Sequence, residues 1–365
     1  MKKVLFFIDT LGYGGAEKVL VNLINKMDKE KYDITLMTIF DSGVNKQFLD
    51  KNVKYKFIFK KVFRGNVMFF KLFSPEFLYK KYIGEKYDTV VSYLEGNTTR
   101  ILSGCPYEDT RKLAWIHVEM DMKTRLYPYR SMKECKECYK KFDKIVGVSG
   151  TVIESFESQL GKWDTTTVRY NTVDTDFIKE CAEEPLEDLE IKKDMPNLIS
   201  VGRLIEQKSY KRLLRIHKRL VDEGLRHILY IIGTGGQRDS LQRYIDDNNL
   251  EDTAYLLGFK DNPWKYESKM DMFVCSSIKE GFSTAVTEAL ILGLPVVTTL
   301  CSGMKEMLGE SEFGLITENE EEALYEGIKK MLKDKELFEN YKTKSKERSD
   351  FFSWKKTVEK TEEIL

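Results

Sequence analysis

The feature that most constrains the fold of this chain is an alternation of strand-like and helix-like segments that occurs in both halves. In the first half, short apolar runs typical of buried strands stand at 3–9, 32–40, 87–94, 112–117 and 144–150. In the second half, similar runs stand at 197–204, 227–235, 253–259, 270–277 and 295–299. Helical patterns separate them, which predicts right-handed βαβ units and parallel sheets. The sequence therefore predicts an α/β protein with two Rossmann-like domains facing a central cleft.

One stretch between the halves has the composition of a linker. Residues 180–195 are acidic, contain proline and show no clear period. We therefore expect one domain at 1–185, a second at 186–349 and a final helical segment at 350–365.

Composition argues against several classes of protein. Lysine plus arginine and aspartate plus glutamate number 59 each, and this balance is untypical of a dedicated nucleic-acid binder. No apolar run approaches the roughly 20 residues of a membrane-spanning helix. Six cysteines are few for this length, and the first residues resemble no secretory signal, so we expect a cytoplasmic protein. Cys135 and Cys138 form a C-x-x-C pair without a second ligand pair, so we expect no metal site.

A glycine-rich loop follows the first apolar run. Gly12, Gly14 and Gly15 precede a helical pattern, where glycines allow close backbone approach and leave helix N–H groups for an anion. A dinucleotide fingerprint needs a third glycine where Glu17 stands, so NAD fits poorly although Asp41 ends the next strand. A tight turn without a ligand is another interpretation.

Two cations follow the first strand of the second half. Arg203 and Lys208 stand where the next helix begins, and a guanidinium fork with an ammonium point charge suits a diphosphate. A solvated basic helix start is the alternative. Two later strand ends carry glycine: Gly233 opens a G-x-G loop, and Gly258 precedes Phe259, where backbone and ring could contact a nucleobase.

The segment 280–297 places Glu280 ahead of a helical run and Glu288 inside it. Gly281–Thr284 would form the helix N-terminus, whose partial positive charge of about half a unit favours a phosphate. A carboxylate accepts two hydroxyl hydrogen bonds, so one glutamate can hold a sugar and the other a ribose. The alternatives are an exposed helix carboxylate for Glu288 and an acid that stabilises the first turn for Glu280.

The order of these motifs resembles a known family. The segments VGRLIEQK, IIGTGG, LGF and EGFSTAVTE are similar to the nucleotide-sugar half of retaining family 4 glycosyltransferases, which have the GT-B fold. The first half is similar at GGAE, WIHVE, VGVSG and YNTVDTDFI. The segment 301–316 resembles that of members that build bacterial surface or capsular polysaccharides. The resemblance covers nearly the whole chain.

The resemblance implies roles for the matching residues. Arg203 and Lys208 would bind the donor diphosphate, Glu288 the ribose and Glu280 the donor sugar, while His117 would lie near the donor sugar and the acceptor hydroxyl. His117, Glu280, Arg203 and Lys208 form the implied catalytic set. The other implied donor contacts are Gly15, Gly233, Gly258, Phe259, Gly281, Phe282, Ser283 and Thr284. The implied acceptor side comprises Gly14, His117 and Asn171.

The resemblance also assigns the domains. Residues 1–185 would bind the acceptor, residues 186–349 would bind the nucleotide sugar, and the helix at 350–365 would cross back to the first domain. Two departures from the family pattern could alter sugar choice. Ser209, a candidate helix cap, and Ser283 stand where the family often has glycine.

Three histidines are present. His117 ends an apolar run, and on residue type alone a satisfied core histidine is an equal alternative to a site residue. His217 lies in a basic helical pattern and His227 begins a strand, so we interpret both as structural or solvated.

Residues 54–82 interleave eight basic residues with aromatic ones and contain a single acid, Glu76. Such a composition suits anionic lipid, at roughly 1 kcal/mol per cation near the membrane. Part of the stretch, at 54–59, also reads as a core strand. The hypothesis is that the first domain docks on the inner membrane face and meets a lipid-linked acceptor there.

Together these features predict a metal-independent, retaining glycosyltransferase without a cofactor. It would move a sugar from a nucleotide-diphospho-sugar, UDP-linked by expectation, to a hydroxyl of a lipid-linked or oligosaccharide acceptor in surface polysaccharide synthesis. We expect a monomer or a weak dimer that binds no nucleic acid. The alternatives are a nucleotide-sugar epimerase on the same scaffold and a non-catalytic binding or chaperone subunit.

Overall fold

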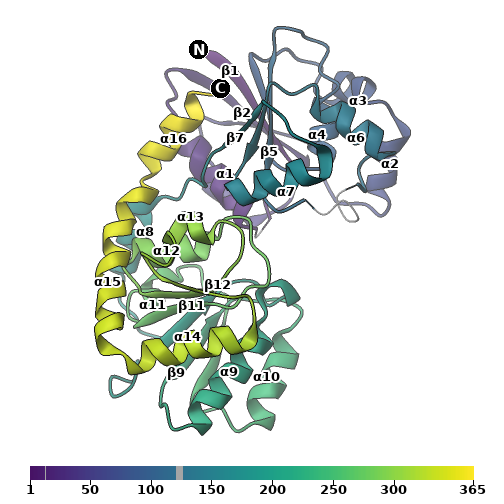
Figure 1. Cartoon of the computed structure of the whole chain (residues 1–365). Helices are drawn as coiled ribbons and strands as arrows, with labels where there is room; N and C mark the ends of the chain where they lie inside the picture. The colour runs from purple at the N-terminus through teal and green to yellow at the C-terminus, as the bar shows by residue number, and fades with distance from the viewer. Residues whose placement is uncertain (13, 121–125) are drawn as a thin grey trace. The chain divides into compact units, whose positions relative to one another are not determined.

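A computed structural model describes residues 1–12, 14–120 and 126–365, and these form two compact units (Figure 1). The first unit comprises Met1–Thr172 together with Trp354–Leu365, and the second comprises Val173–Ser353. Each unit is an open parallel sheet covered by helices, which confirms the predicted pair of Rossmann-like folds.

The sheet of the first unit has seven strands in the order β3-β2-β1-β4-β5-β6-β7, with parallel neighbours throughout. Its strand β1, third in this order, is fully buried from Val4 to Ile8, as expected where helices cover both faces. The strands are β1 (Lys2–Ile8), β2 (Tyr32–Phe40), β3 (Lys54–Phe59), β4 (Thr89–Ser92), β5 (Arg111–Ile116), β6 (Lys144–Gly147) and β7 (Thr166–Val168).

Helices of the first unit follow the apolar spacing of the sequence. In α1 the buried residues include Val19, Leu20, Leu23 and Ile24, which form one face at helical spacing. The helical elements are α1 (Gly15–Lys26), η1 (Val44–Phe48), α2 (Asn66–Leu72), α3 (Pro75–Tyr82), α4 (Asn97–Leu102), α6 (Met132–Tyr139), α7 (Gly150–Leu160) and α16 (Trp354–Glu362).

The end of the chain belongs to the first unit. Helix α16 packs on α1 (Figure 1). Beyond it, the carbonyl of Leu365 accepts hydrogen bonds from Lys2 Nζ at 2.6 Å and from Thr89 Oγ1 at 2.7 Å. Both partners are the first residues of neighbouring strands, so the final residues fasten the amino edge of this sheet.

The sheet of the second unit has six strands in the order β10-β9-β8-β11-β12-β13, again parallel. Helices α9 and α14 pack on it through an apolar cluster that includes Leu213, Leu220, Leu324 and Ile328. The strands are β8 (Asn197–Val201), β9 (Ile228–Ile232), β10 (Ala254–Gly258), β11 (Met272–Cys275), β12 (Val296–Thr299) and β13 (Leu315–Thr317). The helical elements are α8 (Thr175–Ala182), η2 (Glu206–Lys208), α9 (Tyr210–Asp222), α10 (Arg238–Asp247), α11 (Trp264–Glu267), α12 (Thr284–Ile291), α13 (Met304–Leu308), α14 (Glu321–Lys333), α15 (Lys335–Ser349) and η3 (Asp350–Phe352).

The division between the units differs from the expected boundary after residue 185. The stretch at 180–195, interpreted as a linker, lies in the second unit and is held there by polar contacts. Asp188 pairs with Lys260 Nζ at 2.6 Å, and Asn262 Nδ2 donates to the carbonyl of Cys181 at 2.8 Å. Residues 180–195, whose acidic composition suggested a free linker, are therefore packed on the second unit. Within the described ranges, no helix is both long and apolar enough to cross a bilayer.

Candidate active site at the strand ends

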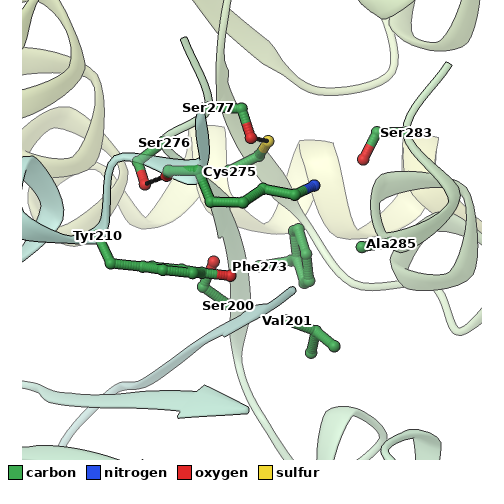
Figure 2. A pocket seen from close by; sticks show the side chains of 10 residues that line it. Ser200, Val201, Tyr210, Phe273, Cys275, Ser276, Ser277, Ser283 and Ala285 are labelled. Atoms are coloured by element: carbon green, nitrogen blue, oxygen red, sulfur yellow. Dashed lines mark hydrogen bonds between the residues drawn. The ribbon is translucent and has the colours of Figure 1, made fainter. Parts of the chain in front are cut away.

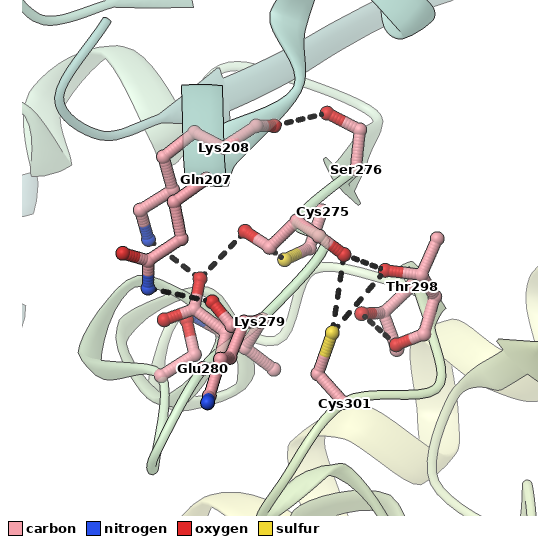
Figure 3. A network of polar contacts seen from close by, with 12 residues as sticks. Gln207, Lys208, Cys275, Ser276, Lys279, Glu280, Thr298 and Cys301 are labelled. Atoms are coloured by element: carbon pink, nitrogen blue, oxygen red, sulfur yellow. Dashed lines mark hydrogen bonds and ion pairs between the residues drawn. The ribbon is translucent and has the colours of Figure 1, made fainter. Parts of the chain in front are cut away.

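Lys208 and Glu280 meet at the carboxyl ends of neighbouring strands β8 and β11. Lys208 ends η2, which follows β8, and its Nζ lies 2.6 Å from Glu280 Oε1. The same carboxylate oxygen accepts a hydrogen bond from Ser277 Oγ at 2.6 Å. Figure 3 shows this pair with its neighbours. The structure thus brings into contact Lys208, which the sequence assigned to the diphosphate, and Glu280, which it assigned to the donor sugar.

The approach of Lys208 depends on glycine at position 202. A Cβ on Gly202 would lie 2.8 Å from Tyr210 Oη and 3.2 Å from Lys208 Cε, so a side chain there would crowd both the tyrosine and the lysine. Burial, the largest single cause, lowers the pKa of Lys208, but the charge and hydrogen bond of Glu280 together with Cys275 and Tyr210 outweigh it, and the pKa is raised. The lysine therefore stays protonated at neutral pH.

A small cavity is lined by residues of β8, β11 and the start of α12, together with Lys208 (Figure 2). Its volume of about 10 Å³ is close to the smallest that can hold one water molecule. Lys208, Tyr210, Ser277 and Ser283 are among its lining residues. A diphosphate is too large for this cavity.

Helix α12 begins beside Glu280, as the sequence predicted. Ser283 occupies the N-cap position, and its side chain accepts a hydrogen bond from the Val286 N–H at 3.4 Å. Glu288 follows in the helix and is only 5% exposed, and Glu280 is 8% exposed. An exposed helix carboxylate is therefore the wrong description of Glu288.

The other predicted donor residues of this unit lie at strand ends or at the start of α12. Arg203 is exposed just after β8, and no ion pair to it is found in the described part of the chain. A Cβ on Gly233 would lie 1.9 Å from the Gly202 carbonyl oxygen, so glycine is required there. Gly258 ends β10 with φ of 73°, and the Phe259 side chain that follows is 52% exposed. Gly281, Phe282 and Thr284 accompany the cap residue at the start of α12.

Ser209 does not cap α9 with its side chain, contrary to the sequence prediction. It stands at the N-cap position with φ of 52° and ψ of 40°, and its side chain makes no capping bond. This left-handed conformation suits glycine, the residue that the resembling family often has here. Ser209 therefore keeps the backbone shape of a glycine at a cost in local strain.

His117 lies just after β5 at the corresponding edge of the first unit's sheet. It is 7% exposed, and its backbone N–H donates to Glu95 Oε2 at 3.1 Å. Burial lowers the pKa of His117 to about 3, although a hydrogen bond with the Tyr93 backbone acts in the opposite direction and raises it. Its Nε2 has no hydrogen-bond partner among the described residues. A neutral imidazole with an open nitrogen can accept from a ligand hydroxyl.

Two acids at this edge were missed by the sequence analysis. Asp9 follows β1 and Glu95 follows β4, and β4 lies between β1 and β5 in the sheet order. Burial first, then the charges of Glu95 and Glu17, raise the pKa of Asp9 to about 7. The sequence signal for Asp9 was an acid placed directly after a buried strand.

The predicted residues of the glycine loop also lie in the first unit. Gly14 is the N-cap of α1 and Gly15 its first residue. A Cβ on Gly14 would lie 2.1 Å from Glu17 Oε2, because the Glu17 side chain folds back over the loop. Asn171 is buried in the segment after β7. These residues belong to the first unit, whereas the predicted donor residues near β8–β12 belong to the second.

The remaining histidines and cysteines have structural surroundings. His217 Nδ1 and His227 Nε2 lie 2.7 Å apart, and both rings are buried, in agreement with a structural role. Cys135 and Cys138 are buried in α6. Across the described ranges, no group of three or more histidine, cysteine, aspartate or glutamate residues is placed to hold a metal ion.

The basic and aromatic stretch at 54–82 divides into an interior and a surface. Five aromatic rings pack against one another, with Phe70 buried and the others half-buried: Phe59, Phe63, Phe69, Phe70 and Phe73. The apolar side chains left exposed are Phe57, Val62, Met68, Leu72 and Phe77. Exposed cations in the same stretch are Lys54, Lys60, Lys61, Arg64, Lys80 and Lys81. We call residues 60–81 the apolar-basic segment.

Comparisons with known proteins agree with this arrangement. The family model described as Glycosyl transferases group 1 matches residues 182–348. A Campylobacter jejuni relative, N-acetylgalactosamine-N,N'-diacetylbacillosaminyl-diphospho-undecaprenol 4-alpha-N-acetylgalactosaminyltransferase, is 29% identical over 372 residues, covering 96% of each chain. The structure of Anabaena Alr3699/HepE in complex with UDP covers 100% of this chain and 99% of its own, at 16% identity and a TM-score of 0.77. That of the apo lipopolysaccharide outer core galactosyltransferase WaaB covers 99% of both chains, at 17% identity and a TM-score of 0.71.

These matches cover both units and include the strand-end residues of the second. Residues 182–348 therefore match the group 1 glycosyltransferases, and the chain has the GT-B fold, as its motifs predicted.

Proposed function

We propose that this glycosyltransferase moves a sugar from a UDP-linked donor to a hydroxyl of a lipid-linked saccharide, with retention of configuration and without a metal ion. The acceptor oxygen forms a bond to the anomeric carbon as the bond from that carbon to the diphosphate oxygen breaks. The nucleoside diphosphate leaves with the electron pair, and its leaving oxygen takes up the proton of the acceptor hydroxyl. The process served would be synthesis of a bacterial surface polysaccharide.

The observation that carries this proposal is the meeting of Lys208, Glu280 and the start of α12 at one edge of the sheet. Negative charge develops on the leaving diphosphate, and preorganised cations and helix N–H groups stabilise such charge best where water is excluded. Arg203 adds a second, exposed cation beside them. Glu280 would accept hydroxyl hydrogen bonds from the sugar and Glu288 from the ribose.

Related proteins support the choice of substrates. The Anabaena structure was solved with UDP, which motivates a uridine donor here. The name of the Campylobacter jejuni relative specifies a diphospho-undecaprenol-linked saccharide as its acceptor, which motivates a lipid-linked acceptor. The chain spans nearly the full length of that relative, so both halves of the activity can be proposed for it.

Contact with an anionic membrane is part of this proposal. The apolar-basic segment exposes Met68 and Leu72 one helical turn apart on α2, at 62% and 71%, with cations before and after them. Apolar side chains that enter the interface and lysines near lipid phosphates both favour docking. The protein would work at the cytoplasmic face of the inner membrane, as a monomer or a weak dimer.

Release of UDP in proportion to an added acceptor tests the catalytic proposal. Purified protein is incubated with UDP-sugars and a lipid-linked saccharide in the presence of EDTA, and UDP and the product's anomeric configuration are measured. We expect acceptor-dependent UDP release with retention. Conversion of the donor into an isomeric nucleotide sugar without an acceptor would instead identify an epimerase. Absence of turnover with tight UDP binding would favour a binding subunit.

Sedimentation with vesicles tests the membrane contact. Vesicles containing phosphatidylglycerol should bind the protein at low salt, whereas vesicles of phosphatidylcholine alone should bind it weakly. Substitution of Met68 and Leu72 by serine should weaken this binding. Phe177→Ser is the matched control, because Phe177 is exposed and apolar but lies in the second unit. Equal binding of the wild type to both vesicles would contradict the proposal.

A further inference from the structure

Glu280 is carried by a loop whose backbone is held by side chains from other elements. We call residues 276–280, between β11 and the start of α12, the carboxylate loop. The carbonyl groups at four consecutive positions of this loop, 276 to 279, all accept hydrogen bonds from side chains. Figure 3 shows one of them, from Gln207 to the Lys279 carbonyl. Loops seldom carry such a set, since most of their backbone groups face water. The loop is therefore fixed in place before any ligand binds.

Two amide side chains hold the half of the loop next to Glu280. Gln207 Nε2 donates to the Lys279 carbonyl at 2.7 Å. Asn319 Nδ2 donates to the Ile278 carbonyl at 2.8 Å. In the other direction, the Ile278 N–H donates to the Gln207 carbonyl at 2.8 Å. A shift of the loop would break bonds on both sides.

The half of the loop next to β11 is held by hydroxyl, thiol and guanidinium groups. The Ser277 carbonyl accepts from Thr299 Oγ1 at 2.6 Å and from Cys301 Sγ at 3.1 Å. Arg212 donates to the Ser276 carbonyl and, at 3.4 Å, to that of Ser277. The loop is thus tied to α9 and to the segment that follows β12.

Arg212 also orients the amide that holds Ile278. Both of its terminal nitrogens lie 3.0 Å from Asn319 Oδ1, so the amide oxygen is fixed and Nδ2 is turned toward the loop. Arg212 is 8% exposed, and burial lowers its pKa without removing its charge at neutral pH. A planar guanidinium can serve the Ser276 carbonyl and the Asn319 amide at once, whereas a lysine offers a single nitrogen.

Arg215, one turn further along α9, makes a different kind of contact. Its Nε donates to Glu321 Oε1 at 3.0 Å, and both side chains are 42% exposed. An exposed pair of this kind contributes about 0–1 kcal/mol. The two arginines therefore share a helix and a charge but differ in whether they reach the carboxylate loop.

We propose that Arg212 and Asn319 are positioning residues that set the place of Glu280 and thereby the recognition of the donor sugar. This inference rests on the proposed function, in which Glu280 contacts that sugar. Neither residue needs to touch the donor, because each acts through the backbone of the loop. A misplacement of about 1 Å at a reacting centre can lower the rate on the order of 100-fold.

The test separates binding of the sugar from binding of the nucleotide. Arg212→Gln should lower kcat/KM for the UDP-sugar by about 10- to 100-fold, while calorimetry finds the Kd for UDP alone hardly changed. Asn319→Ala should show the same pattern and serves if Arg212→Gln does not fold. Arg212→Lys keeps the charge but not the fork, so it should remain defective. Arg215→Gln is the matched control and should change neither quantity.

Distinct outcomes overturn the inference and the proposed function. Equal losses of UDP binding and turnover in the Arg212 and Asn319 variants, or full activity in Arg212→Lys, would overturn the inference alone. So would unchanged turnover in Arg212→Gln. A wild-type protein that neither binds UDP nor turns over any UDP-sugar would overturn the proposed function, and this inference with it.

Discussion

The carboxyl edges of the two sheets can be compared strand by strand, because β3-β2-β1-β4-β5 and β10-β9-β8-β11-β12 follow the same order. In the second unit the ends of β8 and β11 are joined by the Lys208–Glu280 pair. In the first unit the ends of β1, β4 and β5 carry Asp9, Glu95 and His117, none of them cationic at neutral pH.

The difference shows how one fold can supply two kinds of binding surface. A cation beside a helix N-terminus favours a diphosphate, whereas carboxylates and a neutral imidazole favour hydroxyl donors and repel phosphate. The charge pattern thus agrees with a donor edge in the second unit and an acceptor edge in the first. The predictions below test each edge, beginning with the largest effect.

Removal of Lys208 should have the largest effect on activity. Lys208→Ala deletes a cation at the leaving diphosphate, and kcat should fall by about 100- to 1,000-fold. The structure adds that stability should fall too, by about 3 kcal/mol, because Glu280 would be left partly buried without its partner. Steady-state kinetics at low temperature and urea unfolding measure the two effects.

Two further variants make this result specific. Lys211→Ala removes an exposed lysine of α9 and should leave both quantities unchanged. The double variant Lys208→Met/Glu280→Gln removes both charges, so it should regain stability without regaining turnover. Near wild-type kcat in Lys208→Ala would show that the cation of the donor edge lies elsewhere.

Asp9 should make the stability of the first unit depend on pH near neutrality. Its folded pKa of about 7 lies above the ordinary value of 3.8, so the folded protein binds the extra proton between these values. The contribution of Asp9 to stability is therefore greatest below about pH 4, falls as pH rises to about 7, and levels off above that. Asp9→Asn should therefore be more stable than the wild type at pH 8, by about 1–3 kcal/mol, and equal to it near pH 4.

Tryptophan fluorescence can assign this effect to the first unit. Of the four tryptophans, only Trp264 lies in the second unit, so a Trp264→Phe background reports on the first unit alone. Urea unfolding of both proteins in this background at several pH values measures the difference. A difference independent of pH would contradict the assigned protonation of Asp9.

The histidine pair of the second unit should give a pH dependence of opposite sign. Burial and the neighbouring ring lower the pKa of His217 to about 3, and burial lowers that of His227. The unfolded chain therefore takes up protons that the folded unit does not as pH falls below about 6.5. Stability should fall in this window by up to about 1.4 kcal/mol per pH unit for each histidine.

Replacement of both histidines isolates their contribution to the pH dependence of stability. A His217→Leu/His227→Leu variant removes both partners of one buried contact, so it should fold and lose less stability between pH 7 and pH 5 than the wild type. The melting temperature by circular dichroism at the two pH values measures this. His117 is present in both proteins and cancels in the comparison. Parallel pH profiles would refute the assignment.

The sequence predicts strand ends better than it predicts contacts between them. Lys208 and Glu280 could be placed at one edge because each follows a buried strand, and parallel topology brings such positions together. Glu288 could be placed near them because it lies in the helix that begins beside Glu280. The Arg212–Asn319 contact could not be predicted, because it depends on how α9 packs beside the segment after β13. The docking of residues 180–195 likewise depends on tertiary partners such as Lys260, which an acidic composition does not reveal.

Ser209 should show the smallest effect, and a favourable one. A non-glycine residue in the left-handed region costs about 1–2 kcal/mol, while glycine loses about 0.5–1 kcal/mol more backbone freedom on folding. Ser209→Gly should therefore stabilise the second unit by about 0.5–1 kcal/mol. Urea unfolding followed by the fluorescence of Trp264 measures this gain in stability. Ser240→Gly on α10 is the control, and it should destabilise the second unit because glycine has a low helix propensity. A loss of stability in Ser209→Gly would mean that the serine hydroxyl contributes more at the start of α9 than the strained backbone costs.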